Sequence, residues 1–206
     1  MKSVCWSSDD SLIASCSRDK SVWVWNCDDD GDFECLSVMQ EHEQDVKMVK
    51  FHPTKDLLLS CSYDNSIKVW EDSDDEWICI QTLIEHENIV WSVDFEKGGN
   101  RFVSCSSDMY LIVWYNDCGN WKLQQKIEPF HTRPIFSVSW SQVNGMILAA
   151  SGDNRISLYE DKNGAFCRVA EETVHSNDVN CVLWSPVDEI FSTCSDDSTV
   201  AIWSLK

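Results

Sequence analysis

Short apolar runs separated by polar turns fill this chain, and the same arrangement returns at a fixed interval. In the stretch 45–83, for example, alternating or continuous apolar segments cover 45–51, 57–62, 67–70 and 77–83. Runs of this length, bounded by polar turns, are typical of β-strands and not of helices. We therefore expect each unit of the chain to form four short strands.

An aromatic residue ends the third apolar run of each unit, six positions after an acidic residue. The five pairs are Asp19–Trp25, Asp64–Trp70, Asp108–Trp114, Asp153–Tyr159 and Asp197–Trp203. A histidine precedes each of the last four aromatics by about 28 positions, at His42, His86, His131 and His175. A period in the low forties, with His at one end and Trp at the other, indicates a β-propeller blade and hence an all-β fold.

The repeat divides residues 1–206 into five units of one partial propeller. We expect the boundaries 1–25, 26–70, 71–114, 115–159 and 160–206. The first unit starts inside a blade, with three strands and no loop histidine, and the last stops just after its third strand. The expected total is nineteen strands, or about four and three-quarter blades, which leaves out about two blades of the usual seven.

These units resemble the WD-repeat family. In that family a loop His, a Ser or Thr of strand two, a turn Asp and the Trp of strand three form one structural hydrogen-bonded chain in each blade. The resemblance assigns three complete sets: His42, Ser60, Asp64 and Trp70; His86, Ser104, Asp108 and Trp114; His175, Thr193, Asp197 and Trp203. The fourth unit departs from the pattern with Ala149 and Tyr159, so we expect a weaker network there. Because these residues recur in each blade, a catalytic triad is disfavoured.

Acidic residues dominate the charge, with a formal net charge of −19. Segments 28–32, 71–76 and 160–161 follow the third strand of their units, and we expect them to be loops on one face of the propeller. They form either a solubilising surface or a docking surface for a basic partner. Nucleic acid and anionic membranes would be repelled by this charge, so neither is an expected partner.

Eleven cysteines occur, but none forms a Cys-x-x-Cys motif. Cys16, Cys61, Cys105 and Cys194 share one position of the repeat, which is typical of small buried hydrophobic residues. The sequence therefore predicts neither a metal site nor a resident cofactor. So many thiols, without a secretory signal, indicate a reducing cytosol or nucleus.

Two positions in each unit are expected to point outward on the face that propellers use most for binding. One lies five residues after the loop histidine and the other just before the turn aspartate. The candidate partner-binding residues are Arg18, Lys47, Tyr63, Trp91, Phe136, Asn180 and Asp196. The aromatics, with small Ser107 and Gly152 beside them, suit a peptide that carries an apolar side chain and an acidic group. Alternatively, Trp91 and Phe136 fill the mouth of the central channel.

Longer segments resemble one branch of the WD-repeat proteins, the cytosolic iron–sulfur assembly WD-repeat family. The segments are 15–25 (SCSRDKSVWVW), 44–47 (QDVK), 90–93 (VWSV), 176–184 (SNDVNCVLW) and 192–197 (STCSDD). The resemblance implies the last five of seven blades, and a non-catalytic subunit of a targeting complex with a large helical-repeat protein and a small adaptor. That complex helps deliver Fe–S clusters to cytosolic and nuclear apoproteins. The family's exposed functional arginine falls on Arg18.

Three other functions compete with this interpretation. A metal or cluster carrier is disfavoured because the repeated cysteines would lie about a blade apart. An enzyme is disfavoured because the chain has only seven glycines and no Gly-rich phosphate loop. A generic WD-repeat scaffold, such as a ubiquitin-ligase receptor or a signalling adaptor, remains as the alternative function.

Overall fold

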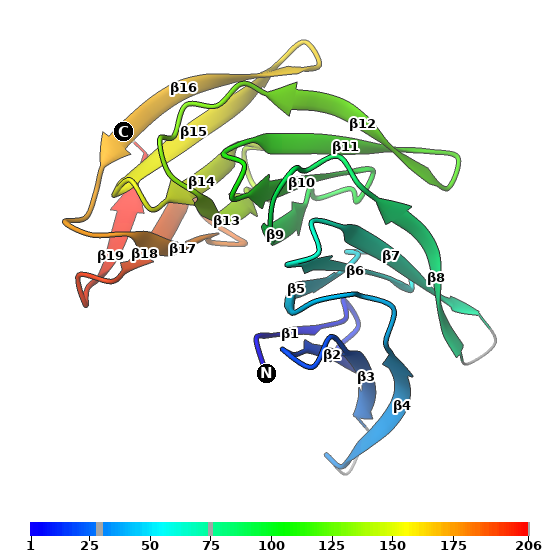
Figure 1. The fold of residues 1–206 in the computed structure, drawn as a ribbon. Helices are drawn as coiled ribbons and strands as arrows, with labels where there is room; N and C mark the ends of the chain where they lie inside the picture. Colours follow the sequence, from blue (N-terminus) through cyan, green and yellow to red (C-terminus); the bar gives the residue numbers. More distant parts are fainter. Residues whose placement is uncertain (28–30, 74–75, 206) are drawn as a thin grey trace. The chain divides into compact units, whose positions relative to one another are not determined.

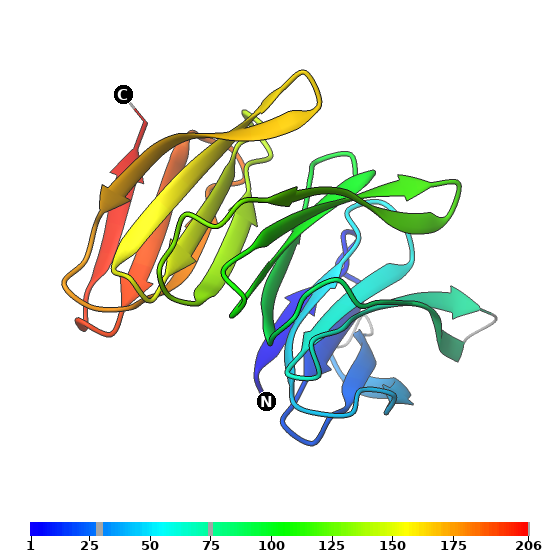
Figure 2. The same cartoon turned by 45° about the horizontal axis from the view of Figure 1, so that its top comes forward.

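The computed structural model describes residues 1–27, 31–73 and 76–205, and all its regular elements are strands. Nineteen strands are present in these ranges, which confirms the expected all-β fold and the strand count. They form four sheets of four strands and one of three, each an antiparallel meander of consecutive strands (Figures 1 and 2). None of the described residues belongs to a helix long and apolar enough to cross a membrane.

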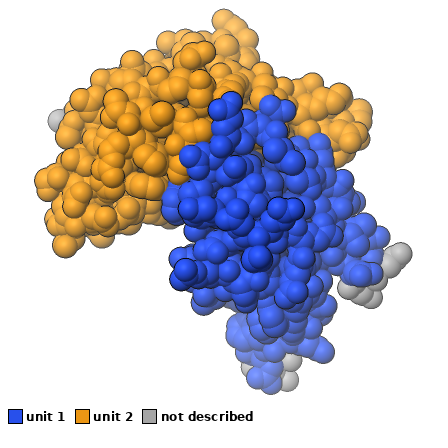
Figure 3. Space-filling model, viewed as in Figure 1, with its two compact units in different colours: residues 1–93 blue, residues 94–206 orange. Residues whose placement is uncertain are grey.

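The chain forms two compact units, residues 1–93 and 94–206 (Figure 3). Unit 1 contains the first two sheets and the start of β9. Its strands are β1 (Ser3–Trp6), β2 (Leu12–Cys16), β3 (Val22–Cys27), β4 (Phe33–Met39), β5 (Val46–Phe51), β6 (Leu57–Ser62), β7 (Ile67–Ser73) and β8 (Glu76–Leu83), followed by β9 (Val90–Phe95).

Unit 2 contains the end of β9 and the remaining strands. These are β10 (Arg101–Ser106), β11 (Leu111–Asp117), β12 (Asn120–Ile127), β13 (Ile135–Trp140), β14 (Ile147–Ser151), β15 (Arg155–Lys162), β16 (Ala165–Thr173), β17 (Val179–Trp184), β18 (Ile190–Ser195) and β19 (Val200–Ser204). The last three form the three-stranded sheet.

Each unit has a core made where neighbouring sheets face each other. In unit 1, Val24 and Val46 are fully buried, and Phe51 meets Trp77 edge-on with ring centroids 5.8 Å apart. In unit 2, Val182 and Trp184 of β17 pack with residues of β14 and β15. Because one sheet buries its faces only against neighbours, the blades that pack together within a unit share their stability.

The turn between strands two and three has one backbone conformation in all five repeats. The residue after the turn aspartate has a positive φ at Lys20 (74°), Asn65 (68°), Met109 (70°), Asn154 (69°) and Ser198 (69°). A left-handed conformation costs an L-residue about 1–2 kcal/mol. The turn aspartate offsets this cost, because its carboxylate accepts the backbone N–H two residues on, as at Asp64–Ser66 (3.0 Å).

The acidic segments after strand three are not simple loops, contrary to our expectation. β7 continues through Glu71 to Ser73, and β15 continues through Glu160 and Asp161. A β-bulge at Val69/Trp70 lets the pairing with β8 continue beyond the aromatic residue, so the hairpin is longer than the apolar run. Residues 28–30 and 74–75 of the predicted acidic loops lie outside the described residues.

Candidate functional site

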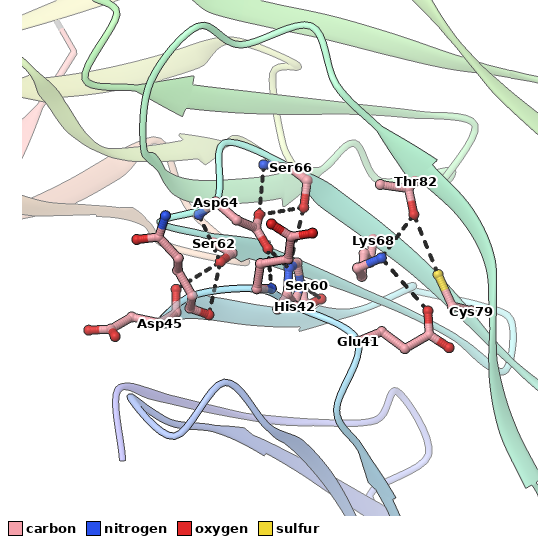
Figure 4. Close-up of polar contacts among 12 residues, drawn as sticks. Glu41, His42, Asp45, Ser60, Ser62, Asp64, Ser66, Lys68, Cys79 and Thr82 are labelled. Atoms are coloured by element: carbon pink, nitrogen blue, oxygen red, sulfur yellow. Dashed lines mark hydrogen bonds and ion pairs between the residues drawn. The ribbon is translucent and has the colours of Figure 1, made fainter.

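The second blade contains the full hydrogen-bonded chain that the repeat predicts, and Figure 4 shows its members His42, Ser60 and Asp64. His42 reaches Asp64 through Nδ1 at 2.8 Å and Ser60 through Nε2 at 2.7 Å. The indole N–H of Trp70 donates to Ser60 Oγ at 2.8 Å. The chain therefore ties the loop before β5 to β6, to the following turn and to β7.

Proton positions in this chain follow from the ionised carboxylate. Burial opposes ionisation, but hydrogen bonds from His42 and Ser66 outweigh it and hold the pKa of Asp64 well below its usual range. In the neutral imidazole, Nδ1–H then donates to Asp64, and Nε2 accepts the hydroxyl proton of Ser60. The Ser60 oxygen is left to accept the Trp70 N–H, so each group in the chain has a partner.

The fifth blade repeats this geometry with a threonine. His175 lies 2.9 Å from Asp197 and 2.7 Å from Thr193 Oγ1, which accepts the Trp203 indole N–H at 2.9 Å. In the third blade, Trp114 donates to Ser104 at 2.9 Å, and the turn carboxylate of Asp108 accepts the backbone N–H of Tyr110. His86 of that repeat is buried.

The fourth blade forms the same hydrogen-bonded chain with a hydroxyl from a different position. We expected a weaker network because Ala149 has no hydroxyl, but Ser157 supplies one. Ala149 on β14 pairs across the sheet with Ser157 on β15. His131 Nε2 lies 2.7 Å from Ser157 Oγ, and Ser157 shares a 3.1 Å hydrogen bond with the Tyr159 hydroxyl. The Tyr-for-Trp and Ala-for-Ser departures therefore belong together, because the hydroxyl has moved to the facing strand.

The hydroxyl groups of these hydrogen-bonded chains lie inside the blades. Ser60 and Ser157 are fully buried, and burial lowers the pKa of His131, which keeps its ring neutral. A catalytic serine needs an open path to its substrate, whereas each of these hydroxyls is enclosed between a histidine and a ring. The arrangement therefore suits a structural function.

A second group of residues is more accessible and lies in unit 1. We call Arg18, Asp45, Lys47, Tyr63 and Trp91 the cation–aromatic cluster. The Lys47 ammonium lies 4.9 Å from the Tyr63 ring centroid and 5.1 Å from that of Trp91. It is also 3.6 Å from Asp45, whose carboxylate lies 3.7 Å from the Arg18 Nε.

The two cations of this cluster differ in exposure. The Arg18 side chain is 83% exposed, whereas that of Lys47 is only 10% exposed. Lys47 is therefore not the outward cation that its repeat position suggested, because the two rings cover it and Asp45 balances its charge. Sequence reasoning missed Asp45, although its position just before β5, two residues from Lys47 on that strand, was a signal.

In unit 2, the loops before β13 and β17 are joined by a salt bridge. Arg133 binds Asp178 through both terminal nitrogens, and it also donates to the Gly152 carbonyl. Asn180 donates to Asp196 at 2.5 Å, so these two predicted residues are paired with each other. Sequence reasoning missed the Arg133–Asp178 pair because the residues are far apart in the chain.

The space beside Gly152 is filled, whereas the sequence suggested vacant space next to Phe136. A Cβ at Gly152 would lie 3.0 Å from Phe136 Cε2, 3.2 Å from Asp178 Oδ2 and 3.3 Å from Arg133 Cζ. The glycine thus allows the aromatic ring and the salt bridge to pack against the backbone. Phe136 itself is half-buried.

Gly152→Ala is therefore expected to lower the free energy of unfolding by about 1–2 kcal/mol, because the methyl group overpacks this site. Gly98→Ala is the matched control, since its Cβ would meet only Asn100 Nδ2, at 3.6 Å. Urea unfolding followed by tryptophan fluorescence measures both changes. Equal midpoints for the two variants would contradict the close packing around Gly152.

The side chains that could bind a metal ion lie apart from one another. Within residues 1–27, 31–73 and 76–205, no three His, Cys, Asp or Glu side chains gather in a way that could hold an ion. Cys16, Cys61 and Cys105 are buried, and burial raises the pKa of Cys16 to about 12. A thiol with so high a pKa is a poor metal ligand at neutral pH.

The repeat geometry and the sequence agree on the class of protein. The chain matches the WD domain, G-beta repeat family over residues 1–26, 33–71, 77–115, 121–160 and 167–204. These segments cover most of its length. The chain therefore belongs to the WD40-repeat family, and its sheets are propeller blades of that type.

Among curated relatives, the chain is similar to CIAO1-type proteins, which confirms the resemblance found in its motifs. It is 34% identical to a probable cytosolic iron-sulfur protein assembly protein 1 of Lodderomyces elongisporus, over 100% of this chain and 60% of the relative. The Scheffersomyces stipitis protein of the same name is 34% identical over 98% of this chain and 65% of the relative. A probable CIAO1 homolog of Nematostella vectensis is 45% identical over 40% of this chain. The chain spans 28% of that relative's length.

Proposed function

We propose that this chain is a non-catalytic interaction module of cytosolic iron–sulfur protein assembly. The observation that carries the proposal is the match of the whole chain to a fungal protein named for that process. The blades support it, because their polar chains serve internal structure and leave the surface for partners. The relatives' names place the process in the cytosol, and we propose that compartment for this chain.

The proposed partners are the subunits of a targeting complex and the apoproteins that receive clusters. We infer that the cation–aromatic cluster of unit 1 contacts an acidic peptide segment with an apolar or aromatic side chain. Arg18 supplies an exposed charge on a strongly acidic chain, so an acidic segment would be drawn to this point. Lys47 and Asp45 would hold the Tyr63 and Trp91 rings beside it. In this proposal the cation–aromatic cluster binds the client's peptide segment and does not itself hold an Fe–S cluster. The Fe–S cluster is delivered to the client.

Reversal of the exposed charge tests this surface. Arg18→Glu is expected to weaken capture of client protein about ten-fold or more, the range for loss of a desolvated charged contact. Lys55→Glu makes the same charge change on an exposed loop of the same unit and should alter capture less than two-fold, or about 0.4 kcal/mol. Binding is measured by titration with the full-length protein and the other complex subunits present.

Two further variants decide whether the cluster acts as a unit. Trp91→Ala and Lys47→Glu should also weaken capture, and their melting curves show whether folding is affected. If Arg18→Glu, Lys47→Glu and Trp91→Ala all retain normal client binding, the contact surface lies elsewhere on the protein. Affinity purification of the full-length protein tests the wider proposal, since co-purification of ubiquitin-ligase or signalling subunits instead of assembly factors would support a generic WD-repeat scaffold.

A further inference from the structure

Two cysteines of the last blade face each other across neighbouring strands. Cys181 on β17 and Cys194 on β18 are directly opposite in the antiparallel register. The Cys181 side chain and backbone both act on the pKa of Cys194, so the two residues are neighbours in space as well as in register. Opposed residues of an antiparallel pair have Cβ atoms about 4.5–5.5 Å apart and project on the same face of the sheet.

The same repeat position in other blades lacks this partner. Cys16 on β2 is opposite Ser3, and Cys61 on β6 is opposite Met48. Both of these thiols are buried, whereas Cys181 is exposed and Cys194 is half-buried. The last blade thus combines an exposed thiol with a second, half-buried thiol opposite it on the neighbouring strand.

We propose that Cys181 and Cys194 form a reversible oxidation site, in which a peroxide converts the two thiols into an intrablade disulfide. The site is additional to the interaction function proposed above and does not depend on it. A small adjustment brings opposed Cβ atoms into the range of about 3.5–4.5 Å that a disulfide requires. The bond would join β17 to β18 through their side chains, in addition to the backbone ladder.

The two cysteines have different tasks in this reaction. The Cys181 thiolate attacks one peroxide oxygen, the O–O bond breaks, and a sulfenic acid and hydroxide form. The Cys194 sulfur then attacks the Cys181 sulfur, the S–O bond breaks, and the hydroxyl group leaves as water with the Cys194 proton. The two sulfurs together lose two electrons. The hydroxide takes up the proton that Cys181 released on ionisation, so the peroxide is reduced to two waters.

Exposure assigns this order. The peroxide must reach the first sulfur, and Cys181 is the more exposed of the two. Burial raises the pKa of Cys194, which disfavours its thiolate and makes it a poor first nucleophile toward the peroxide. Ser137 Oγ lies 3.8 Å from Cys181 Sγ and can donate a weak hydrogen bond to it. A dithiol reductant would reverse the reaction by thiol–disulfide exchange.

Peptide mapping of the intact chain tests the proposal directly. No Lys or Arg lies between residues 168 and 206, so trypsin leaves both cysteines in the single peptide 169–206. After peroxide treatment and alkylation, this peptide should lack both alkyl groups and weigh two hydrogen atoms less than its reduced form. A second cleavage after Glu189 separates the cysteines, so the two halves should stay joined until a reductant is added.

Variants establish that the pair is specific. Cys181→Ser and Cys194→Ser should each abolish the disulfide link between the two halves of the peptide, whereas Cys167→Ser should leave that link unchanged. Cys167 is an apt control because it is exposed on β16 and faces Glu160 and not a cysteine. Because the wild-type chain carries the main measurement, poor folding of a variant does not prevent the test. The proposal is overturned if both cysteines of 169–206 remain alkylated, if either is linked to another cysteine, or if only disulfide-linked dimers form.

Discussion

Asp64→Ala is expected to lower the free energy of unfolding by about 3 kcal/mol, because it removes the acceptor of several donors, among them those of the buried residues His42 and Ser66. Its carboxylate receives His42 Nδ1–H at 2.8 Å and the Glu43 backbone N–H at 2.9 Å. It also accepts the backbone N–H of Ser66 and so holds the left-handed Asn65 in place. Without the carboxylate, the histidine and the turn lose their partner together.

Asp56→Ala is the matched control for this prediction. Asp56 is an exposed aspartate of the same blade, in the loop between β5 and β6. Its replacement should change the free energy of unfolding by no more than about 0.5 kcal/mol. Matched urea curves measure both variants, and equal destabilisation would show that the chain of Asp64 and His42 contributes little to the blade.

Acid provides an independent check on Asp64. Its pKa is lowered in the folded protein, so its stabilising contribution is complete above the unfolded-state value, near pH 4. The contribution is lost as the pH falls below about 4 toward the folded-state pKa. The difference in stability between wild type and Asp64→Ala should therefore be constant from about pH 5 to 7 and should shrink below about pH 4. A difference that persists unchanged at lower pH would contradict an ionised Asp64 as the source.

Ser157→Ala is expected to cost about 2 kcal/mol, because it leaves His131 Nε2 and the Tyr159 hydroxyl without their shared partner in a buried site. Adding Ala149→Ser to this variant returns a hydroxyl to the strand that carries it in other blades, directly opposite residue 157. The double variant should recover about 1 kcal/mol of the loss.

Ser204→Ala serves as the control for the fourth blade. Ser204 is an exposed serine on β19, so its hydroxyl removal should alter the free energy of unfolding by less than about 0.5 kcal/mol. Thermal and urea unfolding of the four proteins provide the comparison. A Ser157→Ala variant as stable as Ser204→Ala would mean that the relocated hydroxyl does not hold the histidine.

The sequence by itself determined the blades of this protein. Polar turns between short apolar runs fix where strands begin, and the six-residue spacing from Asp64 to Trp70 places the turn and the end of the apolar run. These features are local, because a turn and its flanking strands are formed by neighbouring residues. The strand count could therefore be predicted, and so could the residue types of the polar chains in the second and fifth blades.

Tertiary structure decided the features that depend on facing strands. Ser157 replaces the hydroxyl missing at Ala149 only because β14 and β15 pair in one register. Lys47 is covered because its ammonium lies against two rings from separate blades, Tyr63 in the turn after β6 and Trp91 on β9. The continuation of β7 past Trp70 depends on a bulge that restores pairing with β8. Cross-strand neighbours are far apart in the chain, so their contacts follow from register and not from spacing along the sequence.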